Sequence, residues 1–162
     1  MTTYSIDSDT LPLTLDFEGK KLGMVKVRGR FTQTSGEVFF DKHHLDTSFF
    51  DLTIIVGSLN TKNTKRDQHL LGRDFLDEEN YESITFRSIT IKNALEGFST
   101  TGDLTIKAIT QRIDIHFQES NNATLYGVFT IDRKKFDVGS NFPGVIIGTS
   151  ILIEFSLGTN KN

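Results

Sequence analysis

The sequence contains no cysteine and no tryptophan, and only two of its 162 residues are proline. Without cysteine, disulfide bonds, thiolate nucleophiles and thiolate metal ligands are all excluded. There is also no long apolar run of the kind that forms a transmembrane helix, and no internal repeat or low-complexity linker. The length and the even composition therefore predict a single domain over residues 1–162.

An excess of charge of one sign is missing too. The 18 basic and 21 acidic residues give a net charge of −3 and are spread along the chain. Nucleic acids and anionic membranes are usually bound by clustered basic residues, so neither partner is expected. The start of the chain, MTTYSIDSDTLPLTL, lacks the basic and apolar segments of a secretory signal. We expect a cytoplasmic protein, or a periplasmic one if Met1 follows a removed signal.

Phenylalanine, in contrast, is abundant: there are 14 Phe and only 3 Tyr. Each buried Phe contributes roughly 1.5–3 kcal/mol and carries no polar group. So many rings predict a large dry surface. That surface could be the solid core of a sandwich, or it could line an apolar cavity.

Apolar residues alternate with polar ones in several segments, which is typical of strands with one dry face. The strict cases are residues 13–17, 25–31, 113–117 and 151–157, and less regular ones are 37–41, 51–57, 83–94, 97–106 and 123–132. Alternation of this kind favours antiparallel pairing. Short polar links at 18–21, 35–36, 96–97 and 120–122 are interpreted as hairpin turns. Nine or ten such strands would curl into a barrel or split into a sandwich. The apolar parity changes between Phe86 and Ile89, which predicts a β-bulge.

One segment, NTKRDQHLLGRDF at residues 63–75, interrupts this pattern. Thr64, Asn63 or Asn60 can cap a helix, and Gly72 can end it. A helix this short cannot form a layer of its own, so we expect Leu70 and Leu71 to rest on the sheet or across a barrel mouth, as a lid or plug.

Charged residues in two places could carry chemistry, but a structural role is favoured for both. Arg66, Asp67 and His69 could shuttle protons, yet neighbours on a helix point about 100° apart, so they are expected to support the fold. The second group, Asp41, His43, His44 and Asp46, could bind a metal but is more simply a polar loop. No nucleophile or phosphate-loop motif is present. We therefore predict no catalysis, no cofactor and no metal.

The stretch SLNTKNTKRDQHLLGRDFLDEENYESITFRS, residues 58–88, resembles the central signature of the YceI-like family of lipocalin-like, polyisoprenoid-binding proteins. The matching positions are Ser58, Thr61, Arg66, Asp67, His69, Leu70, Asp74, Phe75, Tyr81, Ile84, Thr85 and Phe86. Further matches fall at 27–31, 102–106 and 131–133, so that the resemblance extends over nearly the whole chain.

The resemblance implies an all-β fold: an antiparallel lipocalin-like β-barrel of about eight strands or slightly more, with one short helix in a strand connection. It also implies that a polyisoprenoid, an isoprenoid quinone or another long-chain lipid is held inside. Parity within the strands predicts the ligand-binding lining as Phe17, Val27, Phe31, Phe40, Ile54, Phe86, Phe98, Ile115, Phe117, Phe129, Ile131 and Phe155. Structural roles are expected for the signature residues Arg66, Asp67, His69, Leu70, Asp74, Phe75 and Arg133.

Two alternatives to a lipid carrier stay open. One is a lipid-modifying enzyme that uses His69, Asp67 and Arg66, with Arg133 as a further candidate. The other is a barrel filled by its own phenylalanines, whose outer surface binds a protein. Relatives suggest a possible homodimer, but no residue in the sequence specifies its interface.

Overall fold

The computed structural model describes residues 2–6 and 13–158. Its strands form a single antiparallel sheet in the order β1-β4-β5-β7-β8-β9-β10-β11-β2-β3-β6. Their bounds are β1 Thr2–Ile6, β2 Leu13–Lys21, β3 Val25–Phe31, β4 Thr34–Phe40, β5 Phe49–Ile55, β6 Leu59–Asn60, β7 Ser83–Asn93, β8 Phe98–Ile106, β9 Ile109–Glu119, β10 Leu125–Asp132 and β11 Ser150–Leu157. The helix α1 is Thr64–Leu71, and two 3₁₀ turns are η1 Val56–Ser58 and η2 Arg133–Phe136.

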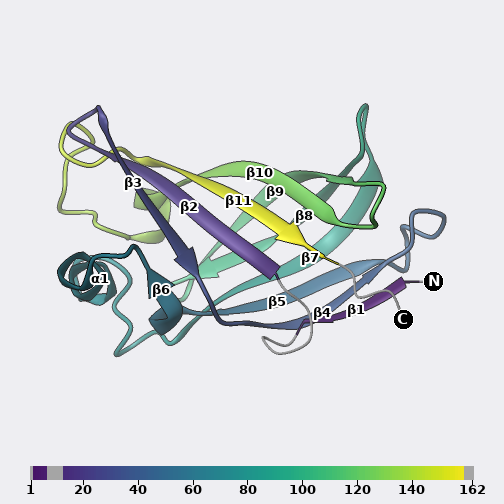
Figure 1. Ribbon diagram of the computed structural model, residues 1–162, viewed down its shortest axis with the longest axis horizontal. Coiled ribbons are helices and arrows are strands. Elements are labelled where there is room, and N and C mark those ends of the chain that lie inside the picture. Colours follow the sequence, from purple (N-terminus) through teal and green to yellow (C-terminus); the bar gives the residue numbers. More distant parts are fainter. Residues whose placement is uncertain (1, 7–12, 159–162) are drawn as a thin grey trace.

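The sheet curls into a barrel (Figure 1). It closes where three pairs of strands lie end to end: β1 with β2, β3 with β4, and β5 with β6. β3 and β4 are separated only by Thr32 and Gln33, and they pair on one side with β6 and β5 and on the other with β2 and β1. Across this link, Thr32 N donates to Ser58 O at 3.2 Å and Ile55 N donates to Gln33 O at 3.0 Å. The 11 strands of the described residues thus fill eight positions around the barrel, and the predicted antiparallel lipocalin-like barrel is confirmed.

The predicted strand segments are all present, and so is the predicted bulge. The register between β7 and β8 shifts between Ser88 and Thr90, which leaves Ile89 unpaired and half exposed at 50%. The extra residue reverses the parity of the rest of β7, as the sequence indicates.

Two predicted turns are wrong. Residues 18–20 lie within β2, which continues to Lys21, and the chain turns at Leu22 and Gly23, whose φ angles are 54° and 74°. Ser35 and Gly36 lie inside β4. Polar residues and glycine are typical of turns. At these positions, however, the residues pair with a neighbouring strand, and this pairing outweighs their local preference for a turn.

The two ends of the barrel differ (Figure 1). At one end lie α1, the β2–β3 turn and the loop between η2 and β11, and at the other lie β1 and the β4–β5 turn. At the β1 end the rings of Phe40, Phe50, Phe98 and Phe117 pack with centroids 5.0–5.6 Å apart, mostly edge to face. Within the described ranges, no helix is long and apolar enough to cross a bilayer.

Candidate ligand-binding cavity

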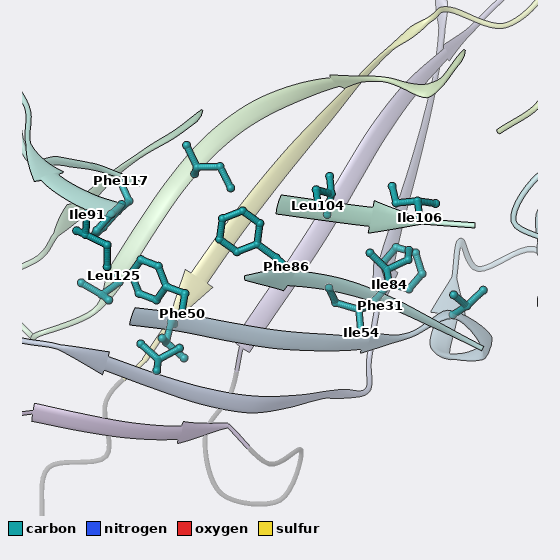
Figure 2. Packing of buried hydrophobic residues seen from close by; sticks show 14 of the residues in the cluster. Phe31, Phe50, Ile54, Ile84, Phe86, Ile91, Leu104, Ile106, Phe117 and Leu125 are labelled. Atoms are coloured by element: carbon teal, nitrogen blue, oxygen red, sulfur yellow. The ribbon is translucent and has the colours of Figure 1, made fainter. Parts of the chain in front are cut away.

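The interior of the barrel is hollow. A cavity of about 450 Å³ lies between the strands, within the range of pockets that enclose small organic ligands. Figure 2 shows inward side chains from neighbouring strands, among them Phe86, Leu104 and Ile54, which line it. The solid interior expected under the filled-barrel alternative is therefore not found.

Ten of the 12 predicted lining residues face the cavity: Phe17, Val27, Phe31, Ile54, Phe86, Ile115, Phe117, Phe129, Ile131 and Phe155. Phe40 and Phe98 do not line it, which corrects their prediction. Both pack at the closed end instead, with ring centroids 5.0 Å apart. Parity indicates which face of a strand points inward but not how far along the barrel a residue lies. Contact of the ten with a ligand stays a prediction.

Sequence reasoning missed many lining residues. The large apolar ones on strands are Leu13, Leu15, Val38, Phe50, Leu52, Leu59, Ile84, Leu104, Ile106, Leu125, Ile151, Ile153 and Leu157. Most of them share the parity of predicted neighbours, so the same signal could have found them. Phe142, Ile146 and Ile147 also line the cavity, but they lie in the loop before β11, where no periodicity marks them.

Three lining phenylalanines occupy space that a missing side chain leaves free. A Cβ built on the glycine would come within 2.8 Å of the ring in the pairs Gly29 with Phe17, Gly102 with Phe86 and Gly127 with Phe155. An aromatic ring beside a glycine in a sheet covers the exposed backbone of the neighbouring strand. The rings therefore lie close to the barrel wall, and the cavity between them stays open.

The inner wall offers little for a polar ligand to bind. Thr100 lines the cavity and is only 2% exposed. Its hydroxyl donates to Thr90 O at 3.0 Å, beside the bulge, so its donor is already used. The other lining residues with charged or titratable side chains are Lys20, Lys21, Arg66, His69 and Arg133, and they come from the α1 end of the barrel.

Helix α1 forms part of this end. Asn63 caps it by accepting from Arg66 N at 3.0 Å, and Gly72 follows its last residue. Leu70 lines the cavity, and both Leu70 and Leu71 pack against the core. The predicted helix is present, and the cavity reaches solvent beside it, because the more than half-exposed His69 lines the cavity. Its role as a lid or plug stays a prediction.

Arg66 and Asp67 hold the start of the helix rather than each other. Asp67 Oδ1 accepts from Thr61 N at 2.9 Å and from Thr61 Oγ1 at 2.5 Å. Arg66 Nε donates to Thr61 Oγ1 at 2.9 Å, and a terminal nitrogen donates to Thr61 O at 2.8 Å. Both side chains thus hold the buried Thr61 by hydrogen bonds.

His69 lies among rings at the cavity mouth. Its imidazole meets Phe75 edge on at 5.0 Å and Phe142 at 6.0 Å, while Nε2 is 4.0 Å from Asp74 Oδ2. The side chains of His69 and Asp74 are more than half exposed. The side chains of Arg66 and Asp67 bind Thr61 and not His69, so the three residues of the enzyme alternative do not form one hydrogen-bonded group.

Arg133, in η2, organises the loop that completes the mouth. It is 2% exposed, and its guanidinium donates five hydrogen bonds to backbone carbonyls. The acceptors are Gly148, Val138, Gly139, Phe142 and Ile147, at 2.5–3.0 Å. Burial lowers the pKa of Arg133 from its usual value, and the nearby Asp132 opposes that shift. All the hydrogen bonds of the Arg133 guanidinium thus go to the backbone of this loop.

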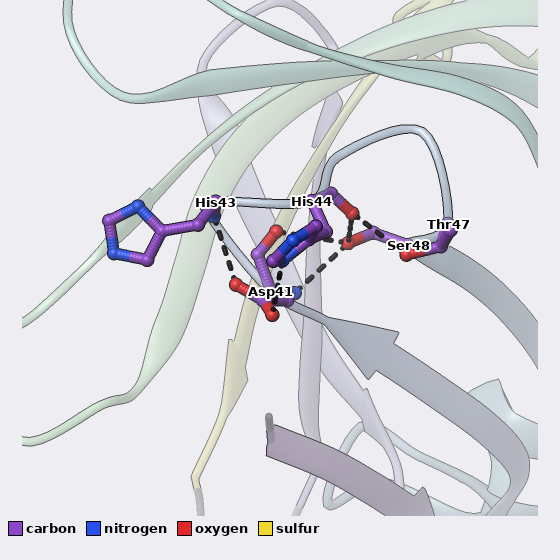
Figure 3. A network of polar contacts seen from close by, with 5 residues as sticks. All are labelled: Asp41, His43, His44, Thr47 and Ser48. Atoms are coloured by element: carbon purple, nitrogen blue, oxygen red, sulfur yellow. Dashed lines mark hydrogen bonds and ion pairs between the residues drawn. The ribbon is translucent and has the colours of Figure 1, made fainter.

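The Asp41 cluster lies at the other end of the barrel and forms a polar turn (Figure 3). Asp41 accepts from His43 N at 2.9 Å and pairs with His44 Nδ1 at 3.0 Å. The hydrogen bonds from His43 and His44 lower the pKa of Asp41. Among the residues that the structure describes, no group of three or more His, Cys, Asp or Glu side chains could hold a metal ion.

An antiparallel barrel that encloses an apolar cavity, with a short helix beside its open end, defines a lipocalin-like class of protein. Within that class a YceI-like domain matches residues 4–158. The chain belongs to the YceI-like family, and the resemblance seen in residues 58–88 is confirmed.

Known relatives agree over nearly the full length. The UPF0312 protein of Staphylococcus aureus strain USA300 is 31% identical over 170 residues, which cover 96% of each chain. The crystal structure of Burkholderia cenocepacia BcnA superposes with a TM-score of 0.86 at 26% identity, over 91% of this chain and 96% of that one. A polyisoprenoid binding domain from Saccharophagus degradans shares the fold, with a TM-score of 0.66 at 15% identity over 96% and 95% of the two chains.

Proposed function

We propose that this protein binds a long apolar lipid inside its barrel, a polyisoprenoid or an isoprenoid quinone, and carries, stores or sequesters it without catalysis. The observation that carries the proposal is the cavity of about 450 Å³, whose wall is apolar and whose charged lining residues come from one end. A neighbour of the same fold is a polyisoprenoid binding domain, which supports this ligand class.

The energetics favour a hydrocarbon chain. Transfer of hydrocarbon from water gains about 0.8 kcal/mol per CH₂, or about 3 kcal/mol for a five-carbon isoprene unit before ordering costs. Away from the α1 end, the lining residues that the structure describes offer no free donor to a polar ligand, because the hydroxyl of Thr100 already donates to Thr90 O. Such a site selects for the length and width of a chain, while a head group would meet the charged residues at the mouth.

The test is mass spectrometry of an organic extract of the purified protein from more than one expression host. We expect a co-purifying lipid in near-stoichiometric amount. Ile115→Phe, which adds bulk to the cavity wall, should reduce the amount of bound lipid by about tenfold. Val128→Phe is the matched control, because Val128 is 52% exposed and does not line the cavity.

Extracts without lipid from every host would refute the proposal, as would equal lipid content in Ile115→Phe and the wild type. Turnover of the bound lipid that is lost in His69→Ala, with lipid content unchanged, would instead support the enzyme alternative.

A further inference from the structure

Two loops meet at the end of the barrel where the cavity opens. One is the β2–β3 turn, and the other is the segment 143–147 before β11. Leu22 N donates to Ile146 O at 2.8 Å, and Lys21 forms an isolated bridge with Ile147. Gly148 N donates to Lys20 O at 2.9 Å, so the two loops form one joined surface.

This surface exposes large apolar side chains. The apolar tip, as we call it, consists of Leu22 at 63% exposure, Met24 at 88%, Val25 at 55%, Val145 at 79% and Ile146 at 42%. These five are close to half of the 11 large apolar side chains that are exposed in the described part of the chain. Such a concentration marks an interaction surface rather than scattered surface residues.

Val25 shows how the tip arises. It has the same parity as Val27 and Phe31, which face the cavity, yet it is exposed. The β2–β3 hairpin extends past the other strands at this end (Figure 1), so its inner face has no opposite wall to pack against. The alternation that places apolar residues on the inner face of β3 thus continues to Val25, where that face is exposed to solvent.

The charge around the tip is positive. Lys20, Lys21 and Lys26 flank it, and no acidic residue occurs in 19–32 or in 138–153. Among the described residues none of these lysines takes part in an ion pair, and the nearby Glu18 is paired with Arg28 at 2.8 Å. The sequence as a whole carries a net charge of −3, which argues against an anionic partner, but the fold gathers these lysines in one place.

The tip also borders the cavity. Lys20, Lys21, Phe142, Ile146 and Ile147 line the cavity as well as belonging to these loops or lying next to them. An apolar surface with lysines along one side is suited to the boundary between head groups and acyl chains of a bilayer that contains anionic lipid. A protein partner would not require these lysines or the continuity of the tip with an apolar cavity.

We propose that the apolar tip docks the protein on a bilayer containing anionic phospholipid, with the cavity mouth facing the membrane. An apolar ligand could then pass between the acyl chains and the cavity without crossing water. The passage of ligand rests on the proposed function, whereas the docking itself does not.

The experiment is flotation of the full chain with vesicles. We expect binding to vesicles of phosphatidylcholine mixed with phosphatidylglycerol, weaker binding to phosphatidylcholine alone, and a loss of binding as salt is raised. The triple variant Leu22→Ser, Met24→Ser, Val145→Ser should bind the mixed vesicles at least about tenfold less. None of these three side chains lines the cavity, so its lipid content should be unchanged.

Two control variants separate the tip from general surface effects. Ile89→Ser, Leu95→Ser, Val128→Ser removes three other exposed apolar side chains and should bind like the wild type. Lys26→Gln should bind the mixed vesicles about fivefold less, while Lys92→Gln, near the other end of the barrel, should not. Thermal unfolding of each variant verifies that it is folded.

Equal vesicle binding by the tip variant and the wild type, or no binding by the wild type, would overturn the docking proposal. So would light scattering that shows a dimer in the wild type and a monomer in the tip variant, because the tip would then contact a second copy. Vesicle binding with a lipid-free extract would leave docking in place and refute the proposed function. A protein that contains lipid but does not bind vesicles would refute docking and leave the proposed function in place.

Discussion

Arg133 is a buried cation whose five hydrogen bonds all go to backbone carbonyls. Carbonyl oxygens carry partial negative charge, so together they replace the water that burial removes. The acceptors span residues 138–148, which means that one side chain fixes the loop that supplies Phe142, Ile146 and Ile147 to the cavity mouth.

Arg133→Met should therefore destabilise the protein, because the carbonyls would lose their donors in a buried site. We expect the free energy of unfolding in urea to fall by about 3 kcal/mol. Arg112→Met is the matched control: Arg112 is 65% exposed and pairs with Asp103 at 3.3 Å, so its loss should cost about 0.5 kcal/mol or less. Equal losses in the two variants would contradict this account of Arg133.

Asp41 leads to a prediction about pH. Hydrogen bonds from His43 and His44 hold the pKa of Asp41 below its usual value of 3.8 in the folded protein. A carboxyl whose folded pKa is lowered stabilises the fold above its unfolded pKa, and this contribution is lost as the pH falls through the folded pKa. Asp41→Asn should therefore make the urea midpoint less dependent on pH below about pH 4. Identical pH slopes for variant and wild type would show that Asp41 does not contribute.

At the scale of single elements, α1 depends on contacts outside itself. Helices of this length are marginal in water, and α1 has no fully buried residue. Its cap on Asn63 and the bonds from Arg66 and Asp67 to Thr61 hold its first turn beside the end of β6.

Asp67→Ala should loosen this helix without unfolding the barrel. Thr61 would lose two hydrogen bonds to a carboxylate, so we expect faster amide hydrogen exchange in 61–71 and a loss of about 1–2 kcal/mol in global stability. Lys65→Ala is a suitable control, because Lys65 is an exposed residue of the same helix turn. Unchanged exchange in α1 of the Asp67 variant would show that the Thr61 contacts do not hold it.

The elements themselves could largely be predicted from the sequence, because strands with one dry face leave a period of two, and the bulge at Ile89 leaves a change of parity. The helix was equally clear from its cap and Gly72. The turn at Leu22 and Gly23 was missed, because an apolar residue with positive φ gives no turn signal.

The same physics limits prediction of the cavity. Parity placed ten residues on the inner wall correctly, but it could not show that Phe40 and Phe98 lie beyond its closed end. The loop fixed by Arg133 could not be predicted either. Its acceptors are backbone carbonyls, which every residue possesses, so no side-chain pattern identifies them.

At the scale of the whole molecule, the open interior depends on how closely the rings lie against the wall. Phe17 and Gly29 are paired directly across β2 and β3, and the ring fills the place of the missing side chain. If Phe17 were displaced, it would have to move toward the cavity that it lines. The absence of a side chain at Gly29 would thus keep the cavity wide by leaving room for the Phe17 ring. Gly29 is not needed there for an unusual backbone conformation.

Gly29→Ala tests this relation, because the nearest atoms to the added Cβ belong only to the side chains of Phe17 and Thr61, all within 2.9 Å. We expect Phe17 to swing inward, with a narrower cavity and about tenfold less co-purified lipid. Gly144→Ala is the control, since its Cβ would meet only Thr149, at 3.4 Å. The double variant Gly29→Ala, Phe17→Ala should regain lipid, because the displaced ring is gone. If the double variant stayed empty, lost stability rather than the displaced ring would explain the single variant.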